Sequence, residues 1–404
     1  MTLPDRLSAD WLTAPASRAV IVALEAVRPG GARYVGGCVR NTLRGLAADD
    51  IDVATQIPPE DVMAALTAAG IRALPTGIEH GTVTAIHDGV PVEITTLRRD
   101  VETDGRRAVV AFTEDWAEDA ARRDFRMNAI YAGADGTLHE VVPGSVADAL
   151  AGRVIFIGDA DQRLIEDYLR ILRFYRFNAW YGAGIDAEGQ AACARQKSGL
   201  AKIAAERIWK ELKRTLAAPD PSAAMLAMEE AGVLAEILPS ADTALLPGLM
   251  AAEKEAGLAP DAMRRLMALL PRRQRDVGEV ASRLKLSNEE SARLAGWADA
   301  ALPHVLGSDE AAIAETFYRF GPDVALDRAA MEAASGARGD LGSLARLAAG
   351  WERPKFPLGG ADALDADLKG PAIGEALGRI EEAWIASGFT LPREALLRLL
   401  RHSD

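Results

Sequence analysis

The segment that most constrains the fold is a short apolar run, residues 32–35, that ends in the glycine pair Gly36-Gly37. The pattern predicts a strand, a tight turn and then a helical turn that carries Arg40. Glycines at such a turn let backbone N–H groups approach a phosphate, and the N-terminus of the following helix favours negative charge. The segment therefore predicts a strand-to-helix turn with an anion site at its tip.

Two aspartates, Asp50 and Asp52, follow on a second predicted strand. Side chains alternate along a strand, so both carboxylates are expected on one face, where they repel each other unless a cation lies between them. Hard oxygen ligands of this kind suit Mg²⁺. A D-x-D pair alone is common and fits two solvated side chains equally well. Joined to the G-G-x-V-R turn, it favours metal-assisted phosphoryl or nucleotidyl transfer.

Length and composition limit the remaining possibilities. A chain of 404 residues is expected to form two or three domains. Its net charge of −13 argues against non-specific coating of nucleic acid or anionic membrane, although a local basic groove remains compatible. Cys38 and Cys193 are the two cysteines, so neither a disulfide framework nor a zinc cluster is expected. The sequence has no signal-like start and no apolar run of ~18 residues, which predicts a cytoplasmic enzyme without membrane contact.

Residues 1–145 carry both helix and strand patterns. Four further elements are predicted here: helices at 15–27 and 60–69, and hairpin strands at 81–86 and 91–97. Glu93, on the returning strand, is expected beside the D-x-D strand. It is either a third carboxylate near the metals or a plain polar residue on a half-buried strand.

A charged segment follows at residues 122–130, with Arg122, Arg123, Asp124 and Asn128 close together. Arginine presents a fork of donors to phosphate, while Asp and Asn can hydrogen-bond a ribose hydroxyl. The alternative is a helix N-terminus with surface ion pairs. Under either interpretation the apolar residues of the segment predict a docked helix. The preceding polar segment, residues 99–119, is predicted to be a mobile loop beside the site.

From about residue 148 onward, strand patterns fade and helix patterns fill the chain. Residues 164–181 are predicted to form one helix with an apolar stripe and a polar face. The polar face comprises Glu166, Arg170 and Arg173, flanked by Asp167 and Arg176. An acceptor beside a donor matches the pairing edges of cytosine and adenine and mismatches those of uracil and guanine. The alternative is an ordinary i,i+4 ion pair between Glu166 and Arg170.

The most basic local run lies at residues 263–275. It is expected to form a solvated helix face, with contact to RNA phosphates as the alternative.

Six motifs occur in a fixed order along residues 18–216. They comprise Gly36, Gly37, Val39 and Arg40; Asp50 and Asp52; Arg122, Arg123, Asp124 and Asn128; Asp148, Gly152 and Arg153; Glu166, Asp167 and Arg170; and Glu206, Arg207, Glu211 and Leu212. In this order and spacing they resemble the class II CCA-adding tRNA nucleotidyltransferases and bacterial poly(A) polymerases of the polymerase-β-like superfamily. Two positions depart from the family pattern: Asn41 stands where the family often has Asp, and Arg126 where it often has Thr.

The resemblance implies an α+β chain with a small mixed-sheet nucleotidyltransferase head at residues 1–145. An all-helical neck at 146–221 would read the base, and a helical body and tail at 222–404 would bind tRNA. Asp50, Asp52 and Glu93 would be catalytic, and Asp50 and Asp52 would hold Mg²⁺. Asp148, Gly152 and Arg153 would form a hinge that admits the larger base.

The expected nucleotide-binding residues are Gly36, Gly37, Arg40, Arg122, Arg123, Asp124, Asn128, Glu166, Asp167, Arg170, Arg173 and Arg176. The implied partners are the 3′ end of tRNA, CTP and ATP, with no obligatory protein partner. A poly(A) polymerase of the same class and a CC-only or A-only enzyme remain alternatives. A non-catalytic RNA-binding paralogue is a further alternative, against which the retained Asp50 and Asp52 argue. A metal phosphohydrolase is disfavoured because its histidine cluster is missing.

Overall fold

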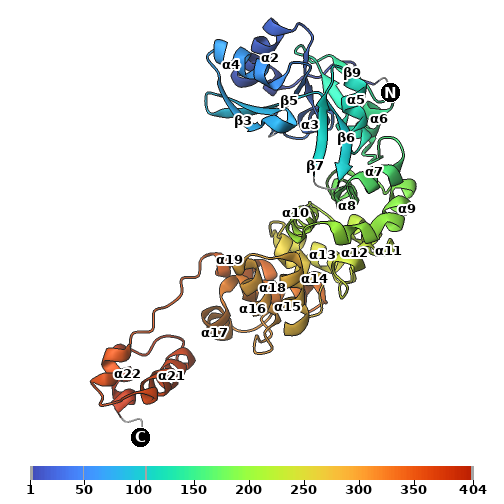
Figure 1. Ribbon diagram of the computed structural model, residues 1–404. Helices are drawn as coiled ribbons and strands as arrows, with labels where there is room; N and C mark the ends of the chain where they lie inside the picture. Colours follow the sequence, from blue (N-terminus) through green and yellow to red (C-terminus); the bar gives the residue numbers. More distant parts are fainter. Residues whose placement is uncertain (1–2, 49, 105–106, 402–404) are drawn as a thin grey trace. The chain divides into compact units, whose positions relative to one another are not determined.

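The computed structural model describes residues 3–48, 50–104 and 107–401, and of residues 100–104 and 107–110 the backbone alone. The chain divides into two compact units, Met1–Pro239 and Ser240–Asp404. The first unit contains the short helix α1 (Asp10–Thr13), a sheet with its covering helices and a run of further helices, and the second unit is helical (Figure 1).

A seven-stranded mixed sheet organises the beginning of the first unit (Figure 1). The strand order is β3-β4-β5-β2-β1-β8-β9, and the pair β2–β5 is parallel while the other neighbours are antiparallel. The strands are β1 (Ala32–Val35), β2 (Asp52–Thr55), β3 (Arg72–Gly77), β4 (Thr82–His87), β5 (Val90–Thr96), β8 (Ile130–Ala132) and β9 (Leu138–Glu140). This confirms the predicted α+β class, with a mixed sheet first and helices after it.

Two amphipathic helices cover one side of this sheet. Helix α2 (Pro15–Val27) contacts β4 and β5, and α4 (Pro59–Ala68) contacts β3 and β4 (Figure 1). Each begins with proline in its first turn, where a missing N–H costs nothing. Leu24 and Leu66 are fully buried on the inner faces. Both predicted helices are confirmed, as is the predicted hairpin β4–β5.

The described parts of the segment predicted as a mobile loop at residues 99–119 are largely regular, and residues 105 and 106 of the segment lie outside the described residues. Strands β6 (Arg98–Asp104) and β7 (Arg107–Phe112) pair antiparallel, and helix α5 (Trp116–Ala121) follows. The Asp115 carboxylate accepts a hydrogen bond from the backbone N–H of Ala117 at 2.8 Å and so caps α5. The prediction was wrong because the strand-forming residues of β7 follow a charged stretch, and the polar character of the whole segment hid the strand pattern.

The expectation of a docked helix at residues 122–130 was also wrong. This segment contains a turn and the single 3₁₀ turn Arg126–Asn128 and then enters β8. Phe125 is fully buried, so the apolar positions serve the core without forming an α-helix.

Seven helices complete the first unit: α6 (Ser145–Ala151), α7 (Ala160–Glu166), α8 (Leu169–Tyr181), α9 (Ala187–Gln196), α10 (Ala205–Leu216), α11 (Ser222–Glu230) and α12 (Val233–Ile237). Helix α8 packs against α10 and α11. The single helix predicted at 164–181 is two helices, because Asp167 takes an extended conformation (φ −150°, ψ 101°). Its carboxylate accepts a hydrogen bond from the N–H of Leu169 at 3.1 Å and so starts α8.

Gly152 ends α6 in the left-handed conformation, with φ of 67°. A Cβ placed there would lie 2.6 Å from the carbonyl oxygen of Tyr181. We expect Gly152→Ala to lower the free energy of unfolding by about 2–3 kcal/mol, from backbone strain plus this clash. Gly158→Ala is the matched control, since Gly158 has φ of 73° and open space around it. Urea unfolding of both variants separates the clash from the strain, and equal losses would contradict the packing argument.

The second unit consists of helices and their connections. They are α13 (Leu246–Ala256), α14 (Ala262–Ala268), α15 (Gln274–Leu284), α16 (Asn288–Ala298), α17 (Glu310–Phe320), α18 (Pro322–Ala334), α19 (Leu341–Ala349), α20 (Gly360–Leu364), α21 (Pro371–Ala386) and α22 (Arg393–Arg401). Helix α18 packs against α13, α16, α17 and α19 and so forms the centre of this unit. No helix of the described segments has both the length and the apolar character needed to cross a bilayer.

The first two arginines of the basic run at residues 263–275 are buried. They form neither a phosphate-binding surface nor a solvated helix face. Arg264 and Arg265 are 6% and 1% exposed. Arg264 donates hydrogen bonds to Asp327 and Glu253, both at 3.2 Å, and Arg265 donates to Glu253 at 3.0 Å. Both expectations for these residues were wrong, because carboxylates from two other helices neutralise them inside the unit.

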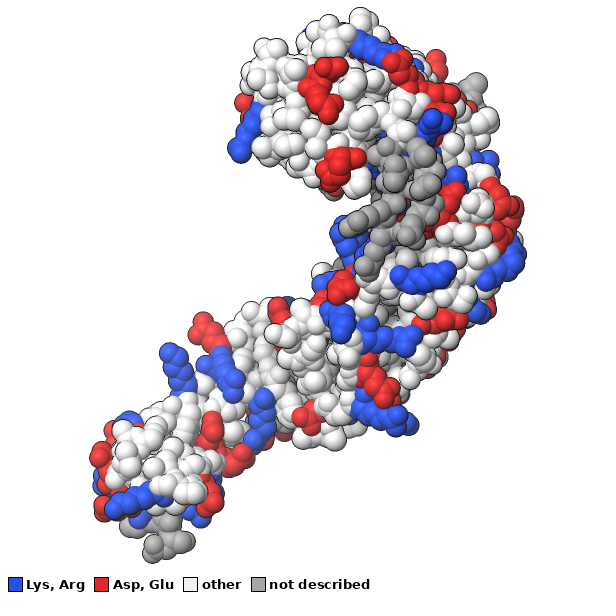
Figure 2. Space-filling view, in the orientation of Figure 1, with Lys and Arg blue, Asp and Glu red and all other residues white. Residues whose placement is uncertain are grey.

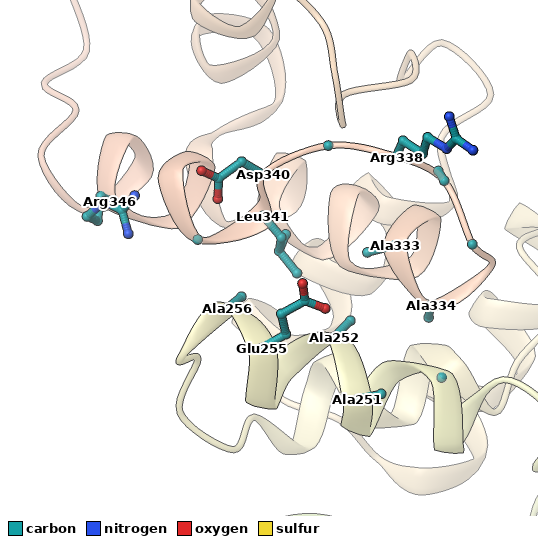
Figure 3. A pocket seen from close by; sticks show the side chains of 15 residues that line it. Ala251, Ala252, Glu255, Ala256, Ala333, Ala334, Arg338, Asp340, Leu341 and Arg346 are labelled. Atoms are coloured by element: carbon teal, nitrogen blue, oxygen red, sulfur yellow. The ribbon is translucent and has the colours of Figure 1, made fainter.

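A pocket of about 730 Å³ lies in the second unit between α13 and the turn before α19 (Figure 3). Its charged lining residues are Glu255, Arg338, Asp340 and Arg346. Asp340 caps α19 through the N–H of Ser343 at 2.8 Å, and Arg346 donates to the Ser343 hydroxyl at 2.7 Å. No residue of the sequence motifs lines this pocket.

Candidate active site

Three carboxylates come together at the start of β2. Asp52 is the first residue of β2 and lies directly opposite Glu93 of the parallel strand β5. Asp50 is exposed and precedes the strand, so the expectation that both aspartates share one strand face was wrong. Burial and then the charge of Glu93 raise the pKa of Asp52 to about 6, while Arg123 opposes this shift and Asp50 adds to it.

The acidic group fits a divalent cation. A carboxylate that is held among like charges gains most from a bound cation. Within the segments that the structure describes, no cluster of three or more His, Cys, Asp or Glu side chains is arranged to hold a metal by itself. Asp50 and Asp52 would therefore share a metal with oxygens from substrate and water, as Mg²⁺ sites commonly do.

The glycine turn faces the same point. Gly36 has φ of 76°, and α3 (Gly37–Leu43) begins directly after it. A Cβ placed on Gly36 would lie 3.9 Å from Nη1 of Arg123 and 4.0 Å from Oδ2 of Asp52. A larger residue is excluded by the backbone conformation, and the space in front of the turn lies between a guanidinium and a carboxylate.

Arg122 and Arg123 share one counter-ion, Asp119 of α5. Both arginines donate to its carboxylate, Arg122 at 2.8 and 2.6 Å and Arg123 at 3.3 and 3.0 Å. Asp119 lies outside the predicted motifs. Its spacing of three and four residues from the two arginines is the signal that identifies it, since such pairs lie together on a helical turn.

Asp124 is buried and already accepts four hydrogen bonds. Oδ2 accepts from Nε of Arg173 at 2.8 Å and also from Nη2, while Oδ1 accepts from the N–H of Phe125 at 2.9 Å and from Asn128 at 3.0 Å. Burial opposes ionisation, but Arg173 and Asn128 outweigh it and lower the pKa of Asp124. A ribose hydroxyl would reach this carboxylate only by replacing one of these donors.

Asn128 connects Asp124 to the first motif. Its amide oxygen accepts from Arg40, and its amide nitrogen donates to Asp124. The Arg40 guanidinium lies over the Tyr181 ring, 4.0 Å from the centroid. Arg40, Asn128, Asp124 and Arg173 therefore form one hydrogen-bonded chain from α3 to α8.

Asn41, the first departure from the family pattern, has a local function. Its amide oxygen accepts from Arg40 at 2.8 Å, and its amide nitrogen donates to the carbonyl of Ala47 at 2.8 Å. An aspartate retains the first contact and loses the second. Asparagine at this position therefore ties α3 to the loop that leads to Asp50.

Arg170 joins the helical segment to the arginine motif. It donates to the carboxylate of Glu166 at 2.8 Å, to the carbonyl of Arg163 at 2.9 Å and to the carbonyl of Arg122 at 3.0 Å. The predicted pairing of Glu166 with Arg170 is present although the helix breaks between them. Since a guanidinium has five N–H donors, Nε and one Nη2 hydrogen remain for other acceptors.

The other two predicted members of this face form ion pairs. Asp167 lies 3.4 Å from Nη2 of Arg207, and Arg176 donates to Glu211 of α10 at 2.6 Å. Glu211 is 7% exposed at its side chain, so this pair belongs to the interior between α8 and α10.

The predicted hinge is held by ion pairs. Asp148 is buried and accepts from Nε of Arg153 at 2.8 Å. Arg126, the second departure from the family pattern, lies 3.2 Å from the same carboxylate. The structure therefore places Asp148, Gly152 and Arg153 together at the end of α6.

Two family profiles match the chain. The profile of the poly A polymerase head domain matches residues 32–156. The profile described as the probable RNA and SrmB binding site of polymerase A matches residues 184–245. The first match covers the sheet and the acidic group, and the second covers helices from α9 to α12.

Similar proteins extend the likeness to almost the whole chain. The mitochondrial CCA tRNA nucleotidyltransferase 1 of Mus musculus is 34% identical over 91% of this chain and 86% of its own length. The Homo sapiens protein of the same name is 33% identical over 91% of this chain and 86% of its own length. The crystal structure of the Bacillus stearothermophilus CCA-adding enzyme with CTP is 26% identical, with a TM-score of 0.76 over 96% of this chain and 98% of that one. This chain therefore belongs to the CCA tRNA nucleotidyltransferase family.

Proposed function

We propose that this enzyme adds C, C and A to the 3′ end of tRNA from CTP and ATP without a nucleic-acid template. The RNA 3′-OH would attack the α-phosphate, and diphosphate would leave. The similarity to CCA tRNA nucleotidyltransferases over 91% of the chain carries this proposal. The arrangement of Asp52, Glu93 and Arg123 around the Gly36 turn supports it, because carboxylates that could hold a metal lie beside a guanidinium that could bind a triphosphate.

Each group has a proposed task in this reaction. The family uses a divalent metal, and we propose Mg²⁺ held by Asp50 and Asp52. A metal bound there supplies Lewis-acid stabilisation of charge at the reacting phosphate. The Gly36-Gly37 turn and Arg123 would contact the triphosphate, and Glu93 would add negative charge beside Asp52. Asp167 and Arg170 would contact the base. The other predicted nucleotide-binding residues would shape the remainder of the nucleotide site: Arg40, Arg122, Asp124, Asn128, Glu166, Arg173 and Arg176.

The domain tasks follow the same proposal. Residues 1–145 would carry out transfer, residues 146–221 would select the base and residues 222–404 would bind tRNA. Lysine and arginine side chains lie interspersed with acidic ones over the helical part that Figure 2 shows. We propose a cytoplasmic location. Because two of the relatives above are named mitochondrial, cell fractionation is the test that distinguishes the two compartments.

An incorporation assay tests the proposed function. Purified protein with Mg²⁺, CTP and ATP is expected to extend a tRNA transcript that lacks its 3′ end by C, C and A. A transcript that already ends in CC should receive A alone. Extension of unrelated RNA by a long A tract would instead indicate a poly(A) polymerase, and addition that stops after CC would indicate the shorter activity. Absence of all incorporation would contradict the proposal.

Arg170→Ala is expected to weaken base choice more than triphosphate binding. Loss of a matched donor to cytosine or adenine removes discrimination of about a hundredfold against UTP and GTP. The measurement is the ratio of kcat/KM for CTP to that for UTP. Arg195→Ala is the control, because Arg195 of α9 forms an exposed ion pair with Asp161 of α7. An unchanged ratio in Arg170→Ala would remove the base-reading assignment.

A further inference from the structure

Asp119 is a buried carboxylate that holds two arginines of the nucleotide site at once. Its side chain is 1% exposed. Oδ1 accepts both hydrogen bonds from Arg122, and Oδ2 accepts those from Arg123 and a third from the Tyr131 hydroxyl at 2.9 Å. Burial alone raises the pKa of such a carboxyl group, but Arg123 and Arg122 outweigh it and lower the pKa of Asp119. The carboxylate therefore stays charged between the two guanidinium groups.

These hydrogen bonds decide which side of Arg123 remains available. Its Nε and Nη2 atoms both point to Asp119, and Nε also lies 3.3 Å from the Tyr131 hydroxyl. A guanidinium is planar, so fixing two nitrogens fixes the third. Nη1 faces the Gly36 turn, 3.9 Å from the position of a Cβ there, and Oδ2 of Asp52 is 4.0 Å from the same position.

Asp119 also steadies the backbone on which the helical segment docks. Through Arg122 it holds the turn whose carbonyl accepts from Arg170 at 3.0 Å. The same carboxylate thus connects Arg123, which faces the Gly36 turn, with Arg170, the proposed base-reading residue.

We propose that Asp119 is a positioning residue for nucleotidyl transfer, which holds Nη1 of Arg123 between the Gly36 turn and Asp52, where the triphosphate binds. Asp119 itself touches neither substrate nor metal. This inference rests on the proposed function. It predicts that loss of the Asp119 charge weakens nucleotide binding specifically, because the guanidinium is then free to rotate.

Steady-state kinetics of Asp119→Asn with 3′-truncated tRNA test this role. We expect KM for CTP and for ATP to rise about tenfold, as for loss of one hydrogen bond to a charged group, while kcat changes less than about threefold. A merely structural role lowers the fraction of folded enzyme, and so lowers kcat without raising KM. Glu118→Gln, on the same helix as Asp119, is the matched control, because its carboxylate accepts from the Thr113 hydroxyl and lies outside the proposed machinery.

A double-mutant cycle with Arg123→Ala shows whether Asp119 acts through Arg123. The Asp119→Asn change should add nothing to KM in the Arg123→Ala background. Unchanged KM in Asp119→Asn, or effects that multiply in the double variant, would overturn the proposal. Failure of the unmodified enzyme to extend any tRNA would instead overturn the proposed function.

A second variant keeps the test informative if Asp119→Asn does not fold. Arg123→Lys retains a charge that reaches Asp119 but leaves no second nitrogen to face the glycine turn. We expect its KM for both nucleotides to rise as much as in Arg123→Ala. Nucleotide binding like that of the unmodified enzyme would show that the arginine serves the ion pair alone, and would overturn the positioning role.

Discussion

Asp52→Asn is expected to abolish nucleotide incorporation, with a fall in kcat/KM of at least about a thousandfold. Loss of a metal ligand removes several kcal/mol of transition-state stabilisation, and each 1.36 kcal/mol corresponds to a factor of about ten. The measurement is incorporation of CTP into 3′-truncated tRNA at saturating Mg²⁺. Asp50→Ala should behave in the same way, since both residues are proposed to bind the metal. Asp61→Asn, an exposed aspartate of α4, is the control for the chemical change.

Asp52→Asn is also expected to be more stable than the unmodified protein when a chelator has removed the metal. The pKa of Asp52 is about 6 in the folded protein, above its ordinary value of 3.8. Between these two pH values the folded state keeps a proton that the unfolded chain has lost. The contribution of Asp52 to stability therefore falls as the pH rises through this window.

Thermal unfolding across pH measures this effect. At pH 7.5 the Tm of metal-free Asp52→Asn should exceed that of the unmodified protein, and the difference should disappear near pH 4. A Tm below that of the unmodified protein at pH 7.5 would contradict the electrostatic account. Normal turnover by Asp52→Asn would remove the metal assignment independently of any stability result.

Asp327→Asn is expected to cause the largest loss of stability. Asp327 of α18 is fully buried, accepts from Nε and Nη2 of Arg293 at 2.7 and 2.8 Å, and accepts from Arg264 at 3.2 Å. Removing one partner of a buried ion pair leaves uncompensated charge in the interior and costs about 3–5 kcal/mol. Urea unfolding, with hydrogen exchange of α13 to α18 as the local probe, measures this loss.

Asp323→Asn provides the matched control on the same helix. Asp323 is exposed in the first turn of α18 and interacts with the helix dipole, which contributes about 0.3–1 kcal/mol. A loss in Asp327→Asn that is no larger than this would show that Arg264 and Arg293 find other partners. The four-helix cluster around α18 would then owe its stability to apolar contacts.

The sequence by itself determined several local elements and the residue types of the candidate site. Local backbone preferences produce the helical periodicity of residues 15–27 and the strand-glycine-helix pattern around Gly36. Such local conformations are retained in the folded protein. The spacing of the motifs around Asp52, Asp124 and Arg170 identified the groups that the structure brings together. Asp124 and Arg173 both belong to the predicted nucleotide-binding residues, and the structure joins them across 49 positions.

Tertiary structure alone decided how those groups are paired. Glu93 lies beside Asp52 because β2 and β5 run parallel in a particular register, which no local pattern encodes. Burial of Arg264, which was expected to be solvated, depends on Asp327 more than sixty positions away. Charge pairs of this kind form after the elements pack, because a carboxylate and a guanidinium are stable inside a protein only where packing brings them into contact. The sequence therefore specified the chemistry of the site, and the fold assigned each charge its partner.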